Sequence, residues 1–165
     1  MMNSRSAHIL VAEDDKSVRL VVQQALARQG YTVQSSGTAA GLWKLIESGR
    51  GDVLISDIAL PDGDALDLLP RIQQHRPDMP VIVMSARSTL LTAVKAQQTG
   101  VFEYLPKPFE LRSLVEATER AVGSIGQSRR RRSHSPVSRR EDRSSAGRAR
   151  CRISSRRWPA SSAPT

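Results

Sequence analysis

Cysteine and long apolar runs are almost absent from this chain of 165 residues, and their absence excludes several classes of protein. Cys151 is the only cysteine, so no internal disulfide can form. No apolar run approaches the roughly 20 residues that span a bilayer. The polar residues Met1 to Ala7 are not followed by the apolar core of a signal peptide. We therefore expect a cytoplasmic location and no membrane partner.

Positive charge is present but unevenly distributed along the chain. The net charge is −1 over residues 1–122 and +10 over residues 123–165, in keeping with +9 for the whole sequence. The second region has 12 arginines and 11 serines, no lysine and no hydrophobic period. This composition is typical of a segment that cannot bury enough apolar surface to fold. We predict one folded domain over residues 6–122 and a disordered basic tail over residues 123–165.

Short apolar runs alternate with segments of helical period in the first region. The runs are Ile9–Ala12, Tyr31–Val33, Val53–Ile55, Val81–Met84 and Phe102–Leu105. Between them, apolar side chains recur at the i, i+3, i+4, i+7 spacing of an amphipathic helix, as at Val18, Val21, Val22 and Ala25. Continuous apolar strands alternating with helices indicate a parallel sheet covered on both faces. We predict an α/β fold with a doubly wound, five-stranded parallel sheet.

Chemically active side chains follow four of these five runs. They are Glu13, Asp14 and Asp15 after the first run, Asp57 after the third, Ser85 after the fourth, and Lys107 after the fifth. Ligands of such sheets bind beyond the carboxyl ends of the strands, so these groups should share one crevice. Clustered carboxylates repel one another and recruit a cation. Oxygen ligands without His or Cys favour Mg²⁺.

This set of side chains indicates a site for a phosphoryl group. Asp57 can act as a nucleophile and form an acyl phosphate, while Lys107 and Ser85 can contact phosphate oxygens. Each residue alone has an ordinary structural explanation, and Asp15 equally suits the N-cap of the following helix. The interpretation depends on their joint occurrence at the ends of separate strands. No glycine-rich phosphate-binding loop occurs in the sequence, which disfavours a nucleotide enzyme.

Four motifs of this sequence resemble the receiver domains of two-component response regulators. They are Ile9-Leu-Val-Ala-Glu-Asp-Asp15, Ser56-Asp57 with Leu60-Pro61, Ser85-Ala86, and Tyr104-Leu-Pro-Lys-Pro-Phe109. The resemblance covers about residues 8–122 and implies a flavodoxin-like receiver fold that is not an enzyme in its own right. It also implies that Asp57 accepts phosphate from a phosphohistidine of a sensor histidine kinase, with Mg²⁺ bound.

The resemblance also assigns roles to individual residues. Arg19 lies five positions after Asp14, where receivers often carry arginine, and this spacing makes Glu13 and Asp14 the acidic pair. The metal ligands implied are Glu13, Asp14, Asp57 and the backbone carbonyl of Ala59. Ser85 and Lys107 are expected to contact the phosphoryl group, with Tyr104 as the aromatic switch residue and a cis bond between Lys107 and Pro108.

Within the family, the likeness is greatest to NtrC-type nitrogen regulators. It is carried by Pro80–Ala86, Tyr104–Phe109 and Asp67–Ile72. Leu60 and Ala65 depart from the usual Met and Gly of the loop after Asp57, but the reacting groups are intact. Such regulators have an ATPase domain and a DNA-binding domain after the receiver, and we expect neither here. The resemblance implies control of transcription. DNA would be bound only by output domains that we do not expect in this chain. The receiver could also form a homodimer.

Two other functions remain open from the sequence. The arginine run Arg129–Arg132 could bind nucleic acid through phosphate contacts. A phosphatase of the haloacid-dehalogenase kind also uses an Asp nucleophile and Mg²⁺, although it requires an acid at the position of Ala59. The composition of the tail from about Gly123 further predicts that it results from a shifted reading frame, with codons for an ATPase domain lying in another frame.

Overall fold

The computed structural model describes residues 6–86 and 89–133 of the chain. Its helices and strands follow in this order: β1 (His8–Ala12), α1 (Lys16–Arg28), β2 (Thr32–Ser36), α2 (Ala39–Glu47), β3 (Val53–Asp57), β4 (Ala59–Leu60), β5 (Gly63–Asp64), α3 (Ala65–His75), β6 (Val81–Ser85), α4 (Leu90–Gln98), β7 (Glu103–Pro106) and α5 (Leu111–Ser133). The alternation of strands and helices is the one that the apolar periodicity predicts.

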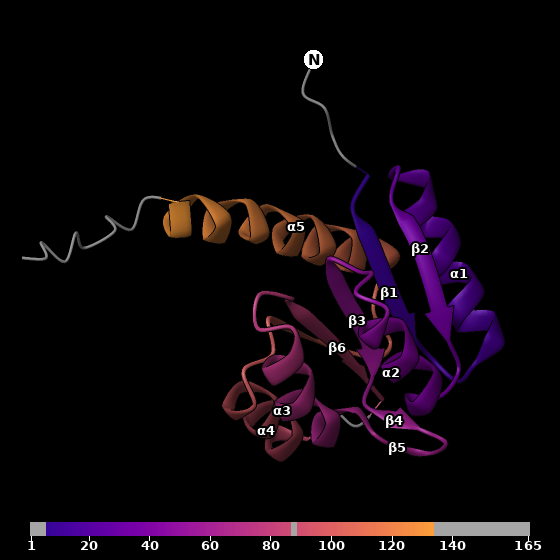
Figure 1. The fold of residues 1–165 in the computed structure, drawn as a ribbon. Coiled ribbons are helices and arrows are strands. Elements are labelled where there is room, and N and C mark those ends of the chain that lie inside the picture. The colour runs from indigo at the N-terminus through magenta and orange to yellow at the C-terminus, as the bar shows by residue number, and fades with distance from the viewer. Residues whose placement is uncertain (1–5, 87–88, 134–165) are drawn as a thin grey trace, which may run out of the picture. The chain divides into compact units, whose positions relative to one another are not determined.

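Five strands form one parallel sheet in the order β2-β1-β3-β6-β7 (Figure 1). The order reverses direction between β1 and β3, so the chain after these two strands crosses to opposite sides of the sheet. This reversal opens a crevice at the carboxyl ends of the strands. The predicted doubly wound α/β fold is therefore confirmed.

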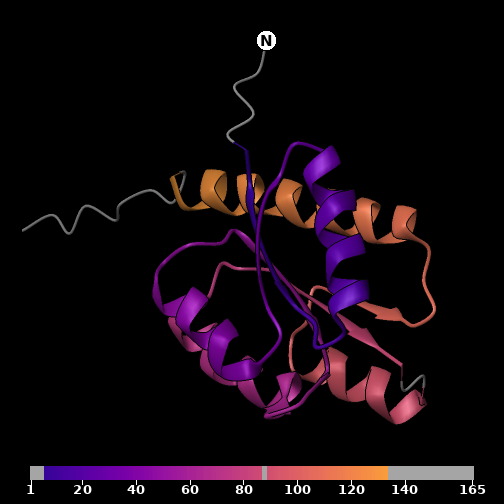
Figure 2. The same cartoon turned by 90° about the vertical axis from the view of Figure 1, so that its right-hand side faces the viewer.

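Alternate residues of the strands point to the two faces of the sheet and form two separate apolar clusters. Leu10, Leu54 and Val83 face a cluster that includes side chains of α2, α3 and α4. Ile9 and Ile55 face a second cluster, which contains side chains of α1 and α5. Figure 2 shows the two groups of helices on opposite sides of the sheet. Burial on both faces explains why the strands are continuously apolar.

The last helix continues beyond residue 122, where we expect the domain to end. Helix α5 continues to Ser133, eleven residues further, and Ile125 packs against the cluster beneath α1 and α5. The first part of the presumed tail is thus helical and in contact with the domain. The rest of that tail, residues 134–165, lies outside the described residues, as does most of what the reading-frame hypothesis concerns.

A two-stranded antiparallel hairpin after β3 was not predicted. Strands β4 and β5 pair Ala59 with Asp64 and Leu60 with Gly63. The backbone N–H of Ala65 donates to the carbonyl of Ile58 at 2.8 Å and closes the hairpin. The segment after Asp57 is therefore a short ordered hairpin at the crevice rather than an irregular loop.

Candidate functional site

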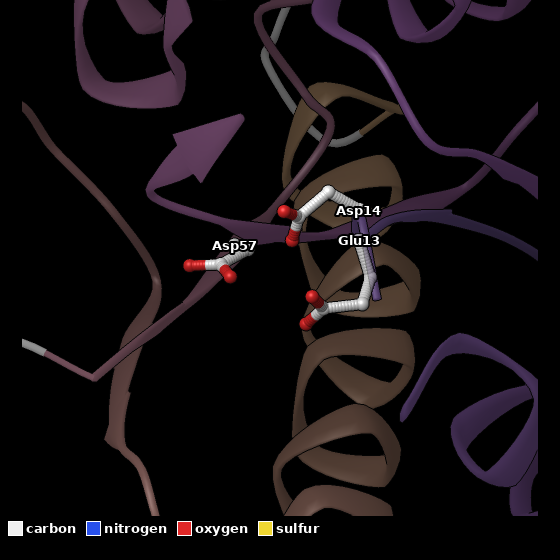
Figure 3. A group of neighbouring side chains, drawn as sticks. All are labelled: Glu13, Asp14 and Asp57. Atoms are coloured by element: carbon white, nitrogen blue, oxygen red, sulfur yellow. The ribbon is translucent and has the colours of Figure 1, made fainter. Parts of the chain in front are cut away.

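The acidic residues expected from the sequence meet at the carboxyl ends of β1 and β3. These strands are paired, with Ala12 opposite Ser56. The residues that follow this pair, Glu13 and Asp57, therefore lie at the same edge of the sheet. One carboxylate oxygen from each of Glu13, Asp14 and Asp57 lies within 4.8 Å of the others (Figure 3). Glu13 and Asp57 are buried, whereas Asp14 is exposed. Because their oxygens lie this close together, we call these three residues the acidic cluster of the site.

Lys107, directly after β7, bridges two members of the acidic cluster. Its Nζ lies 2.7 Å from Glu13 Oε2 and 2.8 Å from Asp57 Oδ2. Its backbone N–H donates to the carbonyl of Ser85 at 2.7 Å and extends the ladder between β6 and β7. The Lys107–Pro108 peptide bond is cis, as the resemblance implies. A single ammonium group thus contacts the two buried carboxylates at once.

Burial and hydrogen bonding shift the pKa values of both Glu13 and Lys107 upward. Burial raises the pKa of Glu13, and the hydrogen bond from Lys107 only partly opposes it. Burial acts to lower the pKa of Lys107, but its hydrogen bonds to Asp57 and Glu13 outweigh burial and raise it. The acidic cluster has three carboxyl groups, and Lys107 contributes one ammonium group beside them. The surplus of negative oxygen ligands, with neither His nor Cys in the group, fits Mg²⁺.

Asp15 serves the helix and not the acidic cluster. Its Oδ1 accepts hydrogen bonds from the backbone N–H groups of Ser17 at 2.8 Å and Val18 at 3.1 Å, which makes it the N-cap of α1. These two bonds hold the pKa of Asp15 below its usual range. Of the two interpretations that the sequence left open, capping is the one seen. The geometry agrees with Glu13 and Asp14 as the acidic pair.

Ser85 and Ala59 line a cleft of ≈ 300 Å³ beside Asp57. Ser85 is buried at the end of β6, the strand that pairs with β3. The backbone N–H of Ala59 lies 3.3 Å from Asp57 Oδ1 and donates to it. The cleft places a hydroxyl and a backbone segment next to the carboxylate, with room for a group attached to it.

Tyr104 lies apart from the acidic cluster. It is half-buried on β7, opposite Val83 of β6, and packs against the apolar cluster that contains Ala96 of α4. Its place between the sheet and α4 is where a side chain could respond to movement of that helix.

Two side chains at this edge have roles that the sequence did not predict. The Nη1 of Arg19 donates to the backbone carbonyl of Glu13 at 2.6 Å. Asp62, in the turn between β4 and β5, accepts from the N–H groups of Ala39 at 2.6 Å and Ala40 at 2.9 Å. Asp62 thus binds the N-terminus of α2 from a separate loop. Of the two, only Arg19 has a sequence signal, which is its spacing of five residues from Asp14. That spacing does not predict its hydrogen bond to Glu13.

Among the described residues, no helix is both long and apolar enough to cross a membrane.

A family model described as the response regulator receiver domain matches residues 9–119 of the chain. The chain is 54% identical over 119 residues to a DNA-binding transcriptional regulator NtrC of Azospirillum brasilense, covering 72% of this chain and 25% of that protein. It is 51% identical over 116 residues to the NtrC of Rhizobium meliloti, covering 70% and 24%. The chain thus spans about a quarter of the length of these relatives.

Solved structures agree with the fold. A CheY-like response regulator receiver domain protein from Methanospirillum hungatei JF-1 superposes with a TM-score of 0.71 at 27% identity, over 74% of this chain and 98% of that one. The beryllofluoride-activated NtrC4 receiver domain dimer gives a TM-score of 0.68 at 29% identity, over 72% and 98%.

Proposed function

Because the chain belongs to the response regulator receiver family, we propose that Asp57 accepts a phosphoryl group from a phosphohistidine of a sensor histidine kinase. One observation carries the assignment: Asp57 is held by Lys107 within the acidic cluster, at the wall of a cleft that also contains Ser85. The chain is a response regulator receiver, NtrC-like in sequence, and not a classical enzyme.

The reaction uses the carboxylate of Asp57 as the nucleophile. An oxygen of Asp57 forms a bond to phosphorus while the bond from phosphorus to the histidine nitrogen breaks, and its electron pair returns to the imidazole ring. Lys107 already lies 2.8 Å from Oδ2, so its ammonium can follow the negative charge onto a phosphoryl oxygen. Ser85 can donate its hydroxyl hydrogen to a second oxygen.

Glu13, Asp14, Asp57 and the carbonyl of Ala59 would hold the Mg²⁺ ion. Bound there, the metal would neutralise negative charge between the carboxylates and the incoming phosphate. The chain's own contribution is to keep these oxygens within reach of one another before the metal arrives. The mutual distances of the acidic cluster, within 4.8 Å, support this assignment, while the carbonyl of Ala59 is assigned by resemblance.

Phosphorylation of Asp57 would change the conformation of α4 and β7. Hydrogen bonding of Ser85 to the phosphoryl group would draw in the segment after β6 and change the packing of Tyr104 against α4. Leu90 and Leu91 at the start of α4 are more than four-fifths exposed, so this helix presents an apolar surface whose position phosphorylation can alter. Such a change is a shift between two conformations that both exist beforehand.

The regulated process follows from the relatives rather than from the site. Proteins named as DNA-binding transcriptional regulators NtrC match about 70% of this chain, which supports control of transcription, in particular of nitrogen-assimilation genes. DNA contact would belong to output domains beyond the receiver. A receiver homodimer has a precedent in the beryllofluoride-activated NtrC4 receiver domain dimer.

The test is phosphate incorporation from acetyl phosphate with Mg²⁺, followed by intact mass and acid-labile phosphate. The unaltered chain should accumulate one acyl phosphate, and Asp57→Asn should accumulate none while keeping its circular-dichroism spectrum. Asp67→Asn is the matched control, because Asp67 is an exposed carboxylate on α3. Labelling of Asp57→Asn would refute the acceptor. Rapid turnover of acetyl phosphate without an acyl phosphate would indicate the phosphatase instead.

A further inference from the structure

The backbone between Glu13 and Asp14 is fixed on each side by a partner from another part of the chain. On one side the N–H of Glu13 donates to the carbonyl of Ser36 at 3.1 Å, one step beyond the β1–β2 pairing. On the other side the carbonyl of Glu13 accepts from Nη1 of Arg19 at 2.6 Å. The direction of this carbonyl sets the plane of the following peptide, and therefore where the side chain of Asp14 can point.

The loop after β2 lies close to the guanidinium group of Arg19. A Cβ atom on Gly37 would fall 2.7 Å from Arg19 Nη1 and 3.8 Å from the carbonyl oxygen of Glu13. The backbone of Gly37 is not in the positive-φ region. A side chain at position 37 would therefore displace the guanidinium group of Arg19 without straining the backbone of residue 37.

We propose that Arg19, seated against Gly37, is a positioning residue that aims the acidic pair Glu13 and Asp14 at the metal site. This inference rests on the proposed function, since it concerns the Mg²⁺ ligands of the same site. Arg19 lies on α1 and contacts the backbone of the acidic segment, so it acts through Glu13 and Asp14 and not on the phosphoryl group.

The direction in which Mg²⁺ affinity changes when Arg19 is removed distinguishes a positioning role from a purely electrostatic one. Arg19 is a cation close to a cation site, so if only its charge mattered, its removal would tighten Mg²⁺ binding by relieving repulsion. If Arg19 positions the ligands, its removal weakens binding, because outer partners that orient metal ligands typically contribute roughly 10-fold or more to affinity. The two roles predict opposite effects of the same substitution.

Gly37→Ala provides an independent test on a different element. It keeps the charge of Arg19 and every carboxylate, but its methyl group occupies the space of the guanidinium and displaces it. Since alanine can adopt the backbone of residue 37, the substitution acts through Arg19. Under the positioning role Gly37→Ala should reproduce the effect of Arg19→Ala, whereas under a charge role it should have none.

The experiment is calorimetric titration of the full chain with MgCl₂ alone, without any phosphodonor. We expect about tenfold weaker Mg²⁺ binding for both Arg19→Ala and Gly37→Ala, with thermal unfolding curves confirming that each variant is folded. Lys16→Ala is the control, because it removes an exposed positive charge from the first turn of the same helix and should leave affinity unchanged or slightly increased.

Amide exchange at Asp14 and Asp15 without metal gives a second readout, which should accelerate in both variants. Unchanged or tighter Mg²⁺ binding in Arg19→Ala, or an unaffected Gly37→Ala, would overturn the proposal. If either variant does not fold, the other decides by the same criteria. Failure of the unaltered chain to bind Mg²⁺ would instead refute the proposed function.

Discussion

Replacing Lys107 by methionine should destabilise the domain far more than the loss of an ordinary ion pair. The substitution keeps an unbranched side chain of nearly the same length but leaves Glu13 and Asp57, whose side chains are only 1% and 11% exposed, without their shared cation. Removing one partner of a buried ion pair costs about 3–5 kcal/mol, because the remaining charge stays buried without compensation. Lys107 itself is 20% exposed, so we expect about 3 kcal/mol at pH 7 without Mg²⁺.

The deficit should depend on pH in a predictable direction. Burial already raises the pKa of Glu13, and Lys107 opposes that rise, so the variant should raise it further. A carboxyl group whose pKa is higher in the folded than in the unfolded chain makes the folded state bind more protons, and stability then increases as pH falls. The loss in Lys107→Met should therefore shrink as pH is lowered from 7 toward the unfolded value of 4.5.

Urea unfolding at several pH values measures both effects. Lys95→Met is the control, because Lys95 pairs with Asp67 at 3.7 Å with both side chains more than half exposed, and such pairs contribute less than about 1 kcal/mol. Adding Asp57→Asn to Lys107→Met should restore part of the stability, since it removes one of the two uncompensated charges. A loss no larger than that of Lys95→Met, or one independent of pH, would refute this account of the site.

Two further predictions concern the acidic segment and the last helix. Asp15→Ala should lower Tm by about 3 °C through loss of the α1 cap while leaving Mg²⁺ affinity intact. Asp14→Ala should instead weaken Mg²⁺ binding while leaving Tm unchanged. Equal effects of the two substitutions on calorimetric Mg²⁺ binding would contradict the assignment of the acidic pair. Deleting residues 134–165 should leave acyl-phosphate formation and urea unfolding unchanged, whereas deletion from residue 124 should cost about 1 kcal/mol because Ile125 is then lost from the apolar cluster. Equal stability of the two truncations would show that the end of α5 contributes nothing.

The strands and the acidic cluster could be predicted because both depend on local pattern and on topology. Apolar runs identify buried strands, and in a parallel sheet their carboxyl ends meet, so Asp57 and Lys107 could be placed together although they are 50 residues apart. The bond from Arg19 to Glu13 could not be predicted, because it joins a side chain to a backbone carbonyl and leaves no periodic trace. The same is true of Asp62, which caps a helix from a separate loop.

The extent of α5 was underestimated for a different reason. Gly123 and Gly126 interrupt the helical pattern at a cost of about 1 kcal/mol each, and the serines and arginines that follow give no apolar period. One side chain, Ile125, provides the packing that the pattern could not reveal.

The long separations within the site have a consequence for when the chain becomes competent during its synthesis. Glu13 and its partner Lys107 are 94 positions apart, and Asp57 precedes Lys107 by 50. A ribosome needs about 3–10 s to add those last fifty residues. Over that interval the nascent chain carries Asp57 without the cation that pairs with it, and β7 has not yet been added to the edge of the sheet. Under the proposed function, phosphorylation of Asp57 therefore requires a receiver whose synthesis has passed Lys107.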